Sequence, residues 1–374
     1  MRKLRLAVIG AGHLGRIHAK LLSSMDDVEL VAVVDPLSTA RDSVAADCRT
    51  VGLAEHHDLL GRIDGAVIAT PTRFHHAVAL DFLRFRIPLL VEKPLCSTIS
   101  QAEELVRAAH EHGAVLQVGH IERFNPALTA ALPHVRQPKF IEAVRASGFT
   151  FRSTDVGVVL DLMIHDLDVV LSLAASPVRS VAAMGLAVVG RHEDVAHARI
   201  EFENGCVANV SASRISPVAR RQMQVWSAQG FTTVDFASRA VSVMRPSETL
   251  LHRKLDAAAV TPEEKAHLKE HLLGEHLPTE TLCVEATNAL VDELTDFARA
   301  IRTSTAPRVP GEAGLAAMAL AGQVLERIAA HAWDGRADGP VGPLAMPPLP
   351  ILRGPHWERA RDGSPYNAPL REAG

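Results

Sequence analysis

The sequence has few cysteines, few aromatic residues and no excess of basic charge. Its four cysteines, Cys48, Cys96, Cys206 and Cys283, are far apart and form no Cys-x-x-Cys pair. This argues against a disulfide framework or a zinc module and indicates a reducing, cytoplasmic environment. The formal net charge is -4, so the chain lacks the basic field that nucleic-acid binding requires. We therefore expect no nucleic-acid partner.

Long hydrophobic runs are also missing. Apolar stretches such as Val181–Gly190 end at about half the length that a membrane span needs. The apolar run after the charged residues Met1–Arg5 is too short for a signal peptide. We therefore expect no membrane partner.

What the sequence does have is length and apolar content. Apolar residues make up 47% of its 374 residues, and the length exceeds the roughly 250–300 residues at which a single core stops growing. We expect a first domain over residues 1–122, a second over 123–335, and a proline-rich tail over 336–374.

Short β-branched runs alternate with helical stretches over residues 4–122, a pattern typical of a parallel sheet covered by helices. The runs lie at Leu4–Ile9, Val28–Val34, Gly65–Ala69, Pro88–Val91 and Ala114–Val118. They are apolar nearly throughout, as expected for strands buried on both faces. The first part therefore predicts an α/β domain with a parallel sheet.

Strand-like stretches dominate after residue 122. They lie near Lys139–Phe151, Val178–Val189, Val195–Phe202, Cys206–Ser213, Gln222–Ser227, Thr232–Phe236 and Ala240–Met244. Helices are expected around Val156–Ala174, from the capping pattern that begins at Thr261, and near Ala286–Arg302 and Gly311–Ala330. Strands in succession predict an α+β domain with a large, mostly antiparallel, open sheet.

A glycine-rich loop lies directly between the first strand and the first helix. Its residues are Gly10, Gly12, His13, Leu14 and Gly15. The first glycine permits a tight turn, the second lets the backbone approach a pyrophosphate, and the third lets the helix pack on the strand. The helix N-terminus supplies N–H donors to the anion. The loop therefore predicts dinucleotide binding.

The second strand ends at Asp35, twenty residues beyond Gly15, where a carboxylate accepts hydrogen bonds from ribose hydroxyls. The alternative is that Asp35 merely caps the next turn. Its charge would repel a 2′-phosphate, and Pro36 follows it rather than an arginine. NAD is therefore favoured over NADP, although Arg41 is near enough in sequence to leave NADP open.

Further motifs follow in order along the chain. They are His18, Ala69-Thr70-Pro71 with His75, Glu92-Lys93-Pro94, Arg123-Phe124-Asn125-Pro126, Asp161 with His165, Leu290–Phe297, Pro307 and Gly311–Leu315. With the glycine loop, this ordered set resembles the Gfo/Idh/MocA family of glucose-fructose oxidoreductase and inositol dehydrogenase relatives over about residues 4–330. The resemblance implies a Rossmann domain followed by a domain whose open sheet presents a substrate site. It also implies a homo-oligomer, a dimer or tetramer, and hydride transfer between a sugar or cyclitol carbon and a nicotinamide.

Hydride removal from a secondary alcohol needs a base for the hydroxyl proton and a cation beside the developing oxyanion. Lys93 follows a strand at the sheet edge where ligands bind, and its ammonium can donate to the reacting oxygen. Glu92 either orients Lys93 or touches the nicotinamide ribose. The resemblance implies a cis peptide bond before Pro94.

Asp161 and His165 are four residues apart, so on a helix they share one face. We expect His165 to be the principal acid/base, with Lys93 as its electrophilic partner and Asp161 on the substrate. Asp168 is expected to set the tautomer of His165. Two alternatives are a metal site made of the same three helix residues and a surface helix with no function.

The resemblance adds further site residues. Thr70, Pro71 and His75 are expected to line the nicotinamide ribose, and the alternative for His75 is that it only begins a helix. Arg123 and Asn125 either contact substrate or anchor the crossover between the domains, and His120 is close enough to this crossover to line the pocket. No function is expected of the remaining histidines, which include His56, His57, His110, His112, His192, His197, His267, His271 and His276.

The segments Gly119–Pro126 and Val159–Asp168 look most like the sugar-nucleotide members of the family, in particular UDP-N-acetylglucosamine 3-dehydrogenases. A pyrophosphate on the substrate would need cationic donors. The candidates are Arg152, Arg214, Arg220 and Arg221. A free sugar or cyclitol is the alternative substrate. The alternatives to an ordinary dehydrogenase are a regulator that binds NAD without chemistry and an enzyme that never releases NAD.

Overall fold

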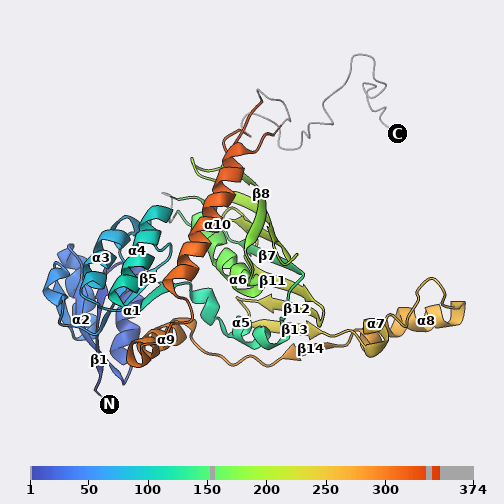
Figure 1. Cartoon of the computed structure of the whole chain (residues 1–374), viewed down its shortest axis with the longest axis horizontal. Helices are drawn as coiled ribbons and strands as arrows, with labels where there is room; N and C mark the ends of the chain where they lie inside the picture. The colour runs from blue at the N-terminus through green and yellow to red at the C-terminus, as the bar shows by residue number, and fades with distance from the viewer. Residues whose placement is uncertain (1, 152–155, 334–338, 346–374) are drawn as a thin grey trace.

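The structure is a computed structural model that describes residues 2–151, 156–333 and 339–345 of the chain. Arg152 and most of the proline-rich tail lie outside the described residues. Two sheets, one of six strands and one of eight, organise the chain into two parts that lie side by side (Figure 1).

The first sheet is the predicted parallel sheet. Its strands are β1 (Leu4–Ile9), β2 (Val28–Val34), β3 (Val51–Leu53), β4 (Gly65–Ile68), β5 (Leu89–Glu92) and β6 (Leu116–Gly119). All its pairs are parallel, in the order β3-β2-β1-β4-β5-β6. This is the doubly wound order in which ligands bind where the strand order reverses, here between β1 and β4. The sequence patterns missed β3, which has only three residues and an exposed Val51.

Helices cover both faces of this sheet. They are α1 (His13–Ser24), α2 (Ser38–Cys48), η1 (His57–Leu59), η2 (Thr72–Phe74), α3 (His75–Arg84) and α4 (Ile99–His112). α4 has clear end signals, because the Thr98 side chain accepts a hydrogen bond from the N–H of Gln101 and Gly113 ends the helix in the left-handed region.

The second sheet is mostly antiparallel, as predicted. Its strands are β7 (Phe140–Ala146), β8 (Val178–Leu186), β9 (Val195–Phe202), β10 (Val207–Ser213), β11 (Arg220–Ser227), β12 (Gly230–Asp235), β13 (Ala240–Met244) and β14 (Thr279–Leu282). The order is β14-β13-β12-β11-β7-β10-β9-β8, and only β7 and β10 pair in parallel. Buried and partly exposed residues alternate along β10, so one face of the sheet carries the core.

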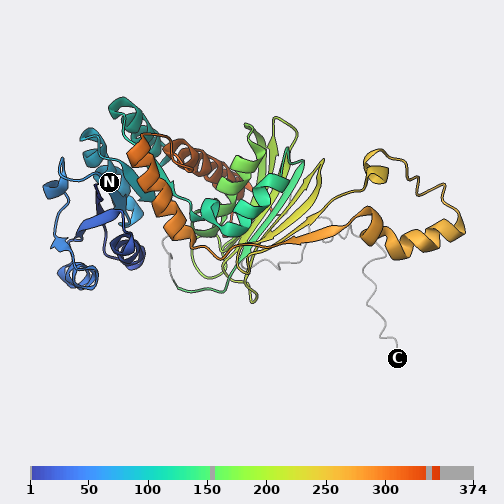
Figure 2. The same ribbon diagram turned by 90° about the horizontal axis from the view of Figure 1, so that it is seen from below.

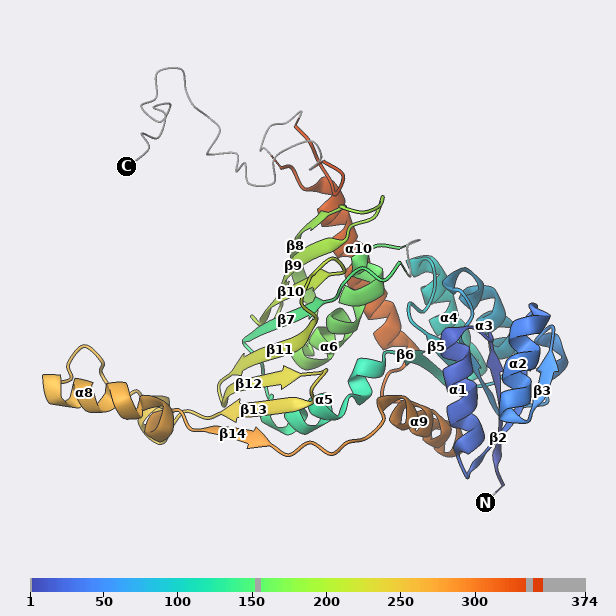
Figure 3. The same cartoon turned by 180° about the vertical axis from the view of Figure 1, so that it is seen from behind.

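The remaining helices lie after residue 120. They are η3 (Ile121–Phe124), α5 (Pro126–Ala131), η4 (Leu132–His134), the π-helical η5 (Val159–Met163), α6 (Ile164–Ala174), α7 (Glu248–Leu251), α8 (Pro262–His271), the π-helical η6 (Leu272–His276), α9 (Ala289–Thr303) and α10 (Gly311–Ala330). η5, α6 and α10 cover the core face of the second sheet (Figure 3). The segment with α7 and α8 extends away from the sheet (Figures 1 and 2).

The last two helices join the two parts. α9 packs Leu294, Phe297 and Ala298 into a core cluster with the first sheet, although it follows the second sheet in sequence. α10 contributes Met318 to the core of the first part and Val324 to the core of the second. These contacts fix the orientation of one sheet against the other.

Among the described helices, α10 alone has the length and mean hydropathy, 1.2, to cross a membrane. The expectation that apolar stretches end near half a span therefore misses this 20-residue helix. Its apolar residues are shared between the two protein cores, as in the core helix of a globular protein.

Candidate active site

The glycine loop leaves room for a ligand at the N-terminus of α1. Gly10 has φ of 105°, and a Cβ on Gly15 would lie 1.8 Å from the carbonyl oxygen of Gly10. Both positions therefore require glycine. A Cβ on Gly12 would meet no atom within 4 Å, and the next two residues, His13 and Leu14, are exposed. This open N-terminus, with no acidic residue in its first turn, fits the pyrophosphate of a dinucleotide.

Asp35 lies beside this loop at the end of β2. Its carboxylate accepts hydrogen bonds from the backbone N–H of Ala11 and of Leu37, both at 2.8 Å. Each oxygen keeps a second acceptor position for a ribose hydroxyl. Arg41 donates to the carbonyl oxygen of Asp35 at 3.2 Å and to the carboxylate of Asp42 at 2.9 Å. The side chain that would have to meet a 2′-phosphate is therefore tied to an acidic neighbour.

Lys93 joins the two parts of the chain at the edge of the first sheet. It follows β5, and its bond to Pro94 is cis, as the resemblance implied. Its ammonium donates to the carbonyl oxygen of Asp161 at 2.7 Å and lies 3.8 Å from Oδ1 of the same residue. Burial lowers the pKa of Lys93, while the charges of Asp161 and Glu92 oppose this shift. Asp161 belongs to the π-helical turn η5, a feature that is frequent at functional sites.

His165 lies at the start of α6, close to Lys93. Burial and the cations Lys93 and Arg145 hold the pKa of His165 well below its usual value. The imidazole is therefore neutral near pH 7 and free to accept a proton. The ring of His120 lies edge-on to it, with centroids 6.4 Å apart. Burial also lowers the pKa of His120.

Several polar atoms around these side chains have no hydrogen-bond partner within the described part of the chain. This unpaired set comprises Oγ1 of Thr70, both ring nitrogens of His120, Nδ1 of His165 and Oδ2 of Asp168. Buried polar atoms normally have partners. A ligand or ordered water is the missing partner that such a set requires.

The expected role of Asp168 is wrong. Its carboxylate faces Arg123, with Oδ1 3.4 Å from Nη1, and it makes no hydrogen bond to His165, whose Nδ1 is unpaired. The alternative metal site is not formed either, because Asp161, His165 and Asp168 are not among the groups of the described chain that bring their ligand atoms within 4.8 Å of one another. The side chain of Arg123 is partly buried and faces the unpaired set through this contact.

A buried ion cluster that the sequence did not reveal lies beneath α6. Arg145 on β7 donates two hydrogen bonds to Asp166, at 2.7 and 3.0 Å, and one to Glu122 at 2.8 Å. All three side chains are at least nine-tenths buried. We call these residues the arginine anchor. The only available signal was that Asp166 and Glu122 lie next to motif residues, and nothing in the sequence pointed to Arg145.

Two residues that were expected near the cofactor or the substrate, His75 and Asn125, contact protein atoms instead. The ring nitrogens of His75 face the carbonyl oxygens of Thr70 and Pro94, at 2.8 and 3.1 Å. His75 thus connects the two loops and offers no ring nitrogen to a ribose. Pro71, which precedes η2, is exposed. Asn125 caps α5 and donates to Glu122 and to the carbonyl oxygen of Phe236, so it anchors the crossover.

The side chain of Glu92 is buried in the first part of the chain. Its Oε1 lies 2.7 Å from Nε2 of His18, and this contact lowers the pKa of Glu92. Glu293 of α9 is fully buried nearby, and neither of its carboxyl oxygens has a partner in the described chain. Burial and the charge of Glu92 raise the pKa of Glu293 well above its ordinary value. Glu293 is therefore held protonated next to an ionised Glu92.

The predicted pyrophosphate ligands that the structure describes differ in whether their guanidinium groups are committed to the fold. Arg214 is buried, donates to Asp194 at 2.7 Å and to the carbonyl oxygen of Val156, and is thus committed to the fold. Arg221 is exposed on β11 directly opposite Arg145 of β7, so both side chains lie on the same face of the sheet. Its charge helps to lower the pKa of His165. Arg220 is also exposed.

A doubly wound sheet with an open glycine loop and a partly buried lysine at its edge, next to a histidine on helix α6 of the second part, defines a dehydrogenase that uses a nicotinamide dinucleotide. Comparison with known proteins agrees. The family described as "Oxidoreductase family, NAD-binding Rossmann fold" matches residues 4–120, and the GFO/IDH/MocA C-terminal domain matches residues 128–232. The chain belongs to the Gfo/Idh/MocA family.

Individual relatives are dehydrogenases. The chain is 32% identical over 338 residues to the UDP-N-acetylglucosamine 3-dehydrogenase of Acidithiobacillus ferrooxidans, covering 89% of this chain and 99% of that protein. It is 30% identical over 234 residues to the scyllo-inositol 2-dehydrogenase (NAD(+)) of Bacillus subtilis, covering 58% and 68%. A solved structure of the Acidithiobacillus enzyme superposes with a TM-score of 0.76 at 31% identity, covering 88% of this chain and 98% of that one.

These findings confirm several expectations. The chain is an oxidoreductase of the dehydrogenase class and its cofactor is NAD. An oxidoreductase of Agrobacterium radiobacter in complex with NAD+ shares the fold, with a TM-score of 0.72 at 17% identity, covering 87% of this chain and 96% of that one. The relatives act on small-molecule sugars or cyclitols.

Proposed function

We propose that this enzyme moves a hydride between NAD and the C3 secondary alcohol of a UDP-linked N-acetylhexosamine, with UDP-N-acetylglucosamine as the first candidate. The observation that carries the proposal is the contact of Lys93 with Asp161, 2.7 Å to the carbonyl oxygen and 3.8 Å to the carboxylate. This contact connects the edge of the first sheet, where the cofactor is expected, to the helical segment that carries His165. The similarity to a UDP-N-acetylglucosamine 3-dehydrogenase over nearly the whole chain supports the substrate.

The chain's own residues hold the cofactor at three places. The N–H groups that follow Gly12 would receive the pyrophosphate, the carboxylate of Asp35 would receive the adenosine ribose, and the unpaired hydroxyl of Thr70 would be available to the nicotinamide end. When bound, the nicotinamide supplies the hydride acceptor.

His165 is the general base in the direction of alcohol oxidation. Its pKa is lowered by burial and by neighbouring cations, so it is neutral at physiological pH and can take the hydroxyl proton. Its imidazolium would be unfavourable beside Lys93, which favours return of the proton in the reverse reaction.

Lys93 and Asp161 hold the reacting alcohol. The Lys93 ammonium donates to the substrate oxygen and stabilises the negative charge that develops on it. Asp161, whose carboxylate is a quarter exposed, accepts from a neighbouring hydroxyl and so selects the carbon that faces the nicotinamide. Arg123 completes this side of the site from η3.

Arg221 favours a nucleotide sugar over a free sugar. Its exposed guanidinium lies on the same face of the sheet as His165 and has a geometry that suits phosphate oxygens. A free cyclitol has no anionic group for it to bind. The alternative function, inositol oxidation, draws on the similarity to a scyllo-inositol 2-dehydrogenase. We also propose that the enzyme works in the cytoplasm as a homo-oligomer.

The direct test is the appearance of NADH at 340 nm with NAD and a set of substrates. The set holds UDP-N-acetylglucosamine, its uronic acid, free glucose and inositol, with His165→Ala as the inactive control. Turnover of the UDP-sugar that is lost in His165→Ala, and a raised KM in Arg221→Ala, is the expected result. Turnover of inositol alone, with Arg221→Ala unchanged, would replace the nucleotide sugar by a cyclitol.

Absence of turnover with every substrate, despite NAD binding, would contradict the proposal and favour a regulatory role. Absorbance of NAD released by heating the purified protein separates this from an enzyme that keeps its cofactor through each cycle.

A further inference from the structure

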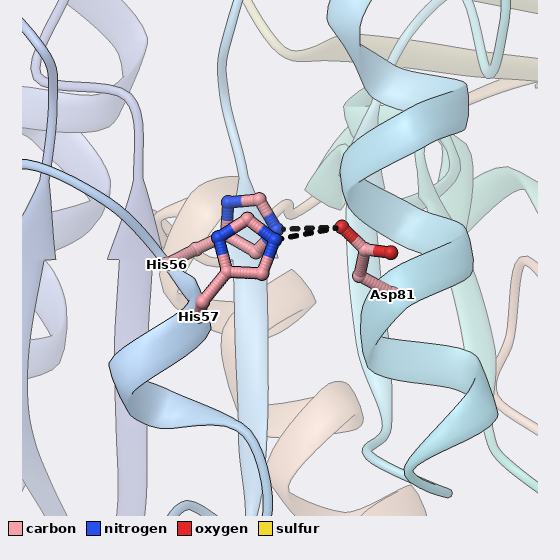
Figure 4. Close-up of side chains that lie close together, drawn as sticks. All are labelled: His56, His57 and Asp81. Carbon is pink, nitrogen blue, oxygen red and sulfur yellow. Dashed lines mark hydrogen bonds and ion pairs between the residues drawn. The ribbon is translucent and has the colours of Figure 1, made fainter.

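Three groups of histidine and carboxylate side chains in the described chain bring their ligand atoms within 4.8 Å of one another. One of them, His56, His57 and Asp81, lies on the surface of the first part, at the contact between η1 and α3 (Figure 4). Sequence analysis expected no function of these two histidines. Their arrangement is more specific than that of solvated side chains.

The two imidazoles converge on one atom. Nε2 of His56 lies 3.0 Å from Oδ2 of Asp81, and Nε2 of His57 lies 3.5 Å from the same oxygen. The two rings are stacked, with centroids 4.2 Å apart and 28° between their planes. Adjacent residues thus turn the same ring atom toward one carboxylate oxygen, as Figure 4 shows.

These separations suit the coordination of a metal ion. Two atoms bound tetrahedrally to zinc at about 2.0–2.2 Å are roughly 3.3–3.6 Å apart. The separation of 3.5 Å lies within that range, and the hydrogen-bonded separation of 3.0 Å lies a few tenths of an ångström below it. In the buried group of His18, Glu92 and Glu293, the contact of 2.7 Å between His18 and Glu92 is that of a hydrogen bond. Only small movements would therefore place an ion among the surface ligands.

The groups around the three ligands also fit. Nδ1 of His57 lies 3.6 Å from a carboxylate oxygen of Glu55, and metal-bound histidines usually donate their other N–H to such a group. Arg84, the nearby cation, lies 3.9 Å from Oδ1 of Asp81, the oxygen that faces away from the histidines. Its side chain is 61% exposed, so it is free to move away from an incoming ion.

The backbone that carries the ligands is fixed, while the ligand atoms are accessible. Leu59 of η1 and Phe82 of α3 belong to the same core cluster, and the ring of His56 contacts the ring of Phe82 with centroids 5.4 Å apart. The side chains of His57 and Asp81 are 60% and 32% exposed. An ion can enter from solvent, and a water molecule can complete a set of three protein ligands.

We propose that His56, His57 and Asp81 bind one divalent transition-metal ion of the zinc type, with Glu55 supporting His57. Two imidazole nitrogens and one carboxylate oxygen are ligands that Zn²⁺ accepts and that Mg²⁺ or Ca²⁺ does not prefer. The bound ion links η1 to α3. This site is separate from the residues proposed for hydride transfer, so it does not depend on the proposed function.

The experiment is a calorimetric titration of the full chain, free of any affinity tag, with Zn²⁺ alone. We expect one saturable site in the unmodified protein and at least a tenfold loss of affinity in both His57→Ala and Asp81→Asn. Glu55→Gln should weaken binding less than either ligand variant, because the Glu55 carboxylate lies 3.6 Å from Nδ1 of His57, beyond hydrogen-bond distance. Mg²⁺ should give no saturable heat.

The matched control is the third group, His267, His271 and Glu275 of α8 and η6. The double variant His267→Ala/His271→Ala should keep the Zn²⁺ affinity of the unmodified protein. Absence of saturable binding would overturn the proposal. So would binding that survives in His57→Ala, or that is lost in the α8 double variant. Thermal unfolding of each variant without metal shows that it is folded, so that lost binding is not lost structure.

Discussion

Asp166 of the arginine anchor directly follows His165 of the unpaired set in the sequence. The polar side chains of the anchor are joined by hydrogen bonds, whereas the atoms of the unpaired set have no partner in the described chain. In the anchor, Arg145 meets two carboxylates through three hydrogen bonds of 2.7–3.0 Å. One residue before the anchor's Asp166, Nδ1 of His165 has no partner in the described chain. The same helix thus carries a satisfied residue and an unsatisfied one side by side.

This difference distinguishes residues that stabilise the fold from residues that are available to bind a ligand. A buried charge is tolerated only when it is paired and hydrogen-bonded, and the anchor meets that condition with protein atoms alone. His120 and His165 leave their acceptors and donors open at the place where the cofactor and the alcohol are expected. The anchor fixes α6 on the second sheet, and the fixed helix holds His165 in position without occupying its ring.

The largest effect is expected from breaking the anchor. Arg145→Ala would leave Asp166 and Glu122 buried without a cation, and loss of one partner of a buried ion pair costs about 3–5 kcal/mol of unfolding free energy. The measurement is chemical denaturation of the variant beside the unmodified protein. Arg199→Ala is the control, because Arg199 and Glu201 form an exposed pair at 3.5 Å that is worth about 0–1 kcal/mol. Equal losses in the two variants would remove the distinction between the anchor and a surface pair.

The second prediction concerns the two residues proposed for proton transfer. His165→Ala and Lys93→Ala should each lower kcat by about 10²-fold or more, because general acid–base groups contribute about 10²–10⁴-fold. NAD affinity, measured by fluorescence titration, should change little, since neither side chain is proposed to hold the pyrophosphate or the adenosine ribose. Near-normal turnover in both variants would contradict the site.

The pH profile tests the same pair more finely. Because the pKa of His165 is lowered, kcat/KM for alcohol oxidation should rise with pH only through a region below 6.5. It should fall again at alkaline pH, where the Lys93 ammonium, whose pKa is also lowered, loses its proton. Removing the Lys93 charge should raise the pKa of His165, since that cation is one cause of the shift. The acid limb of the residual activity of Lys93→Met should therefore lie at higher pH than that of the unmodified enzyme. An acid limb that does not move would show that Lys93 does not act on His165.

The sequence anticipated the parts of the site that depend on local order. The glycine loop, Asp35 at the end of a strand, and Lys93 at the sheet edge follow from strand ends and turn chemistry, and the structure has each where it was expected. The two sheets were likewise expected, because apolar runs and their order along the chain largely determine fold class.

What the sequence missed depends on contacts between distant segments. Arg145 meets Asp166 and Glu122 only because β7 lies in the middle of the second sheet and beneath α6, a placement that no local pattern encodes. The same holds for Glu293, which α9 brings back to Glu92 across about 200 residues of chain. The error on Asp168 has this origin too, since helical spacing favours His165 while the crossover segment supplies Arg123.

Glu293 gives a smaller effect with a defined sign. Its pKa is raised above the ordinary 4.5, so the folded chain holds it protonated, and its contribution to stability is fully present below 4.5 and lost as pH rises toward the raised value. Glu293→Gln removes this titration. The variant should match the unmodified protein at acidic pH and become progressively more stable than the unmodified protein as pH rises above 4.5.

The measurement for Glu293 is denaturation at a series of pH values. Glu326→Gln, at an exposed position of α10, is the control and should show no such trend. A difference that shrinks as pH rises would mean that Glu293 is ionised in the fold.

Asp35 has features of both the arginine anchor and the unpaired set, and its substitution should have the smallest effect of these substitutions. Its oxygens satisfy the N–H groups of Ala11 and Leu37, as in the anchor, and keep acceptor positions for a ribose, as in the unpaired set. Asp35→Ala should weaken NAD binding by about tenfold, since a hydrogen bond to a charged group is worth about 1.5–3 kcal/mol and water replaces part of it. The affinity for NADP should fall less or rise, because the charge that repels a 2′-phosphate is gone.

The ratio of the dissociation constants for NAD and NADP, measured by titration, therefore separates a role in reading the ribose from a role in shaping the loop. A ratio that does not change while both affinities fall would mean that Asp35 only shapes the loop, and Arg41→Ala would then be expected to leave the ratio unchanged as well.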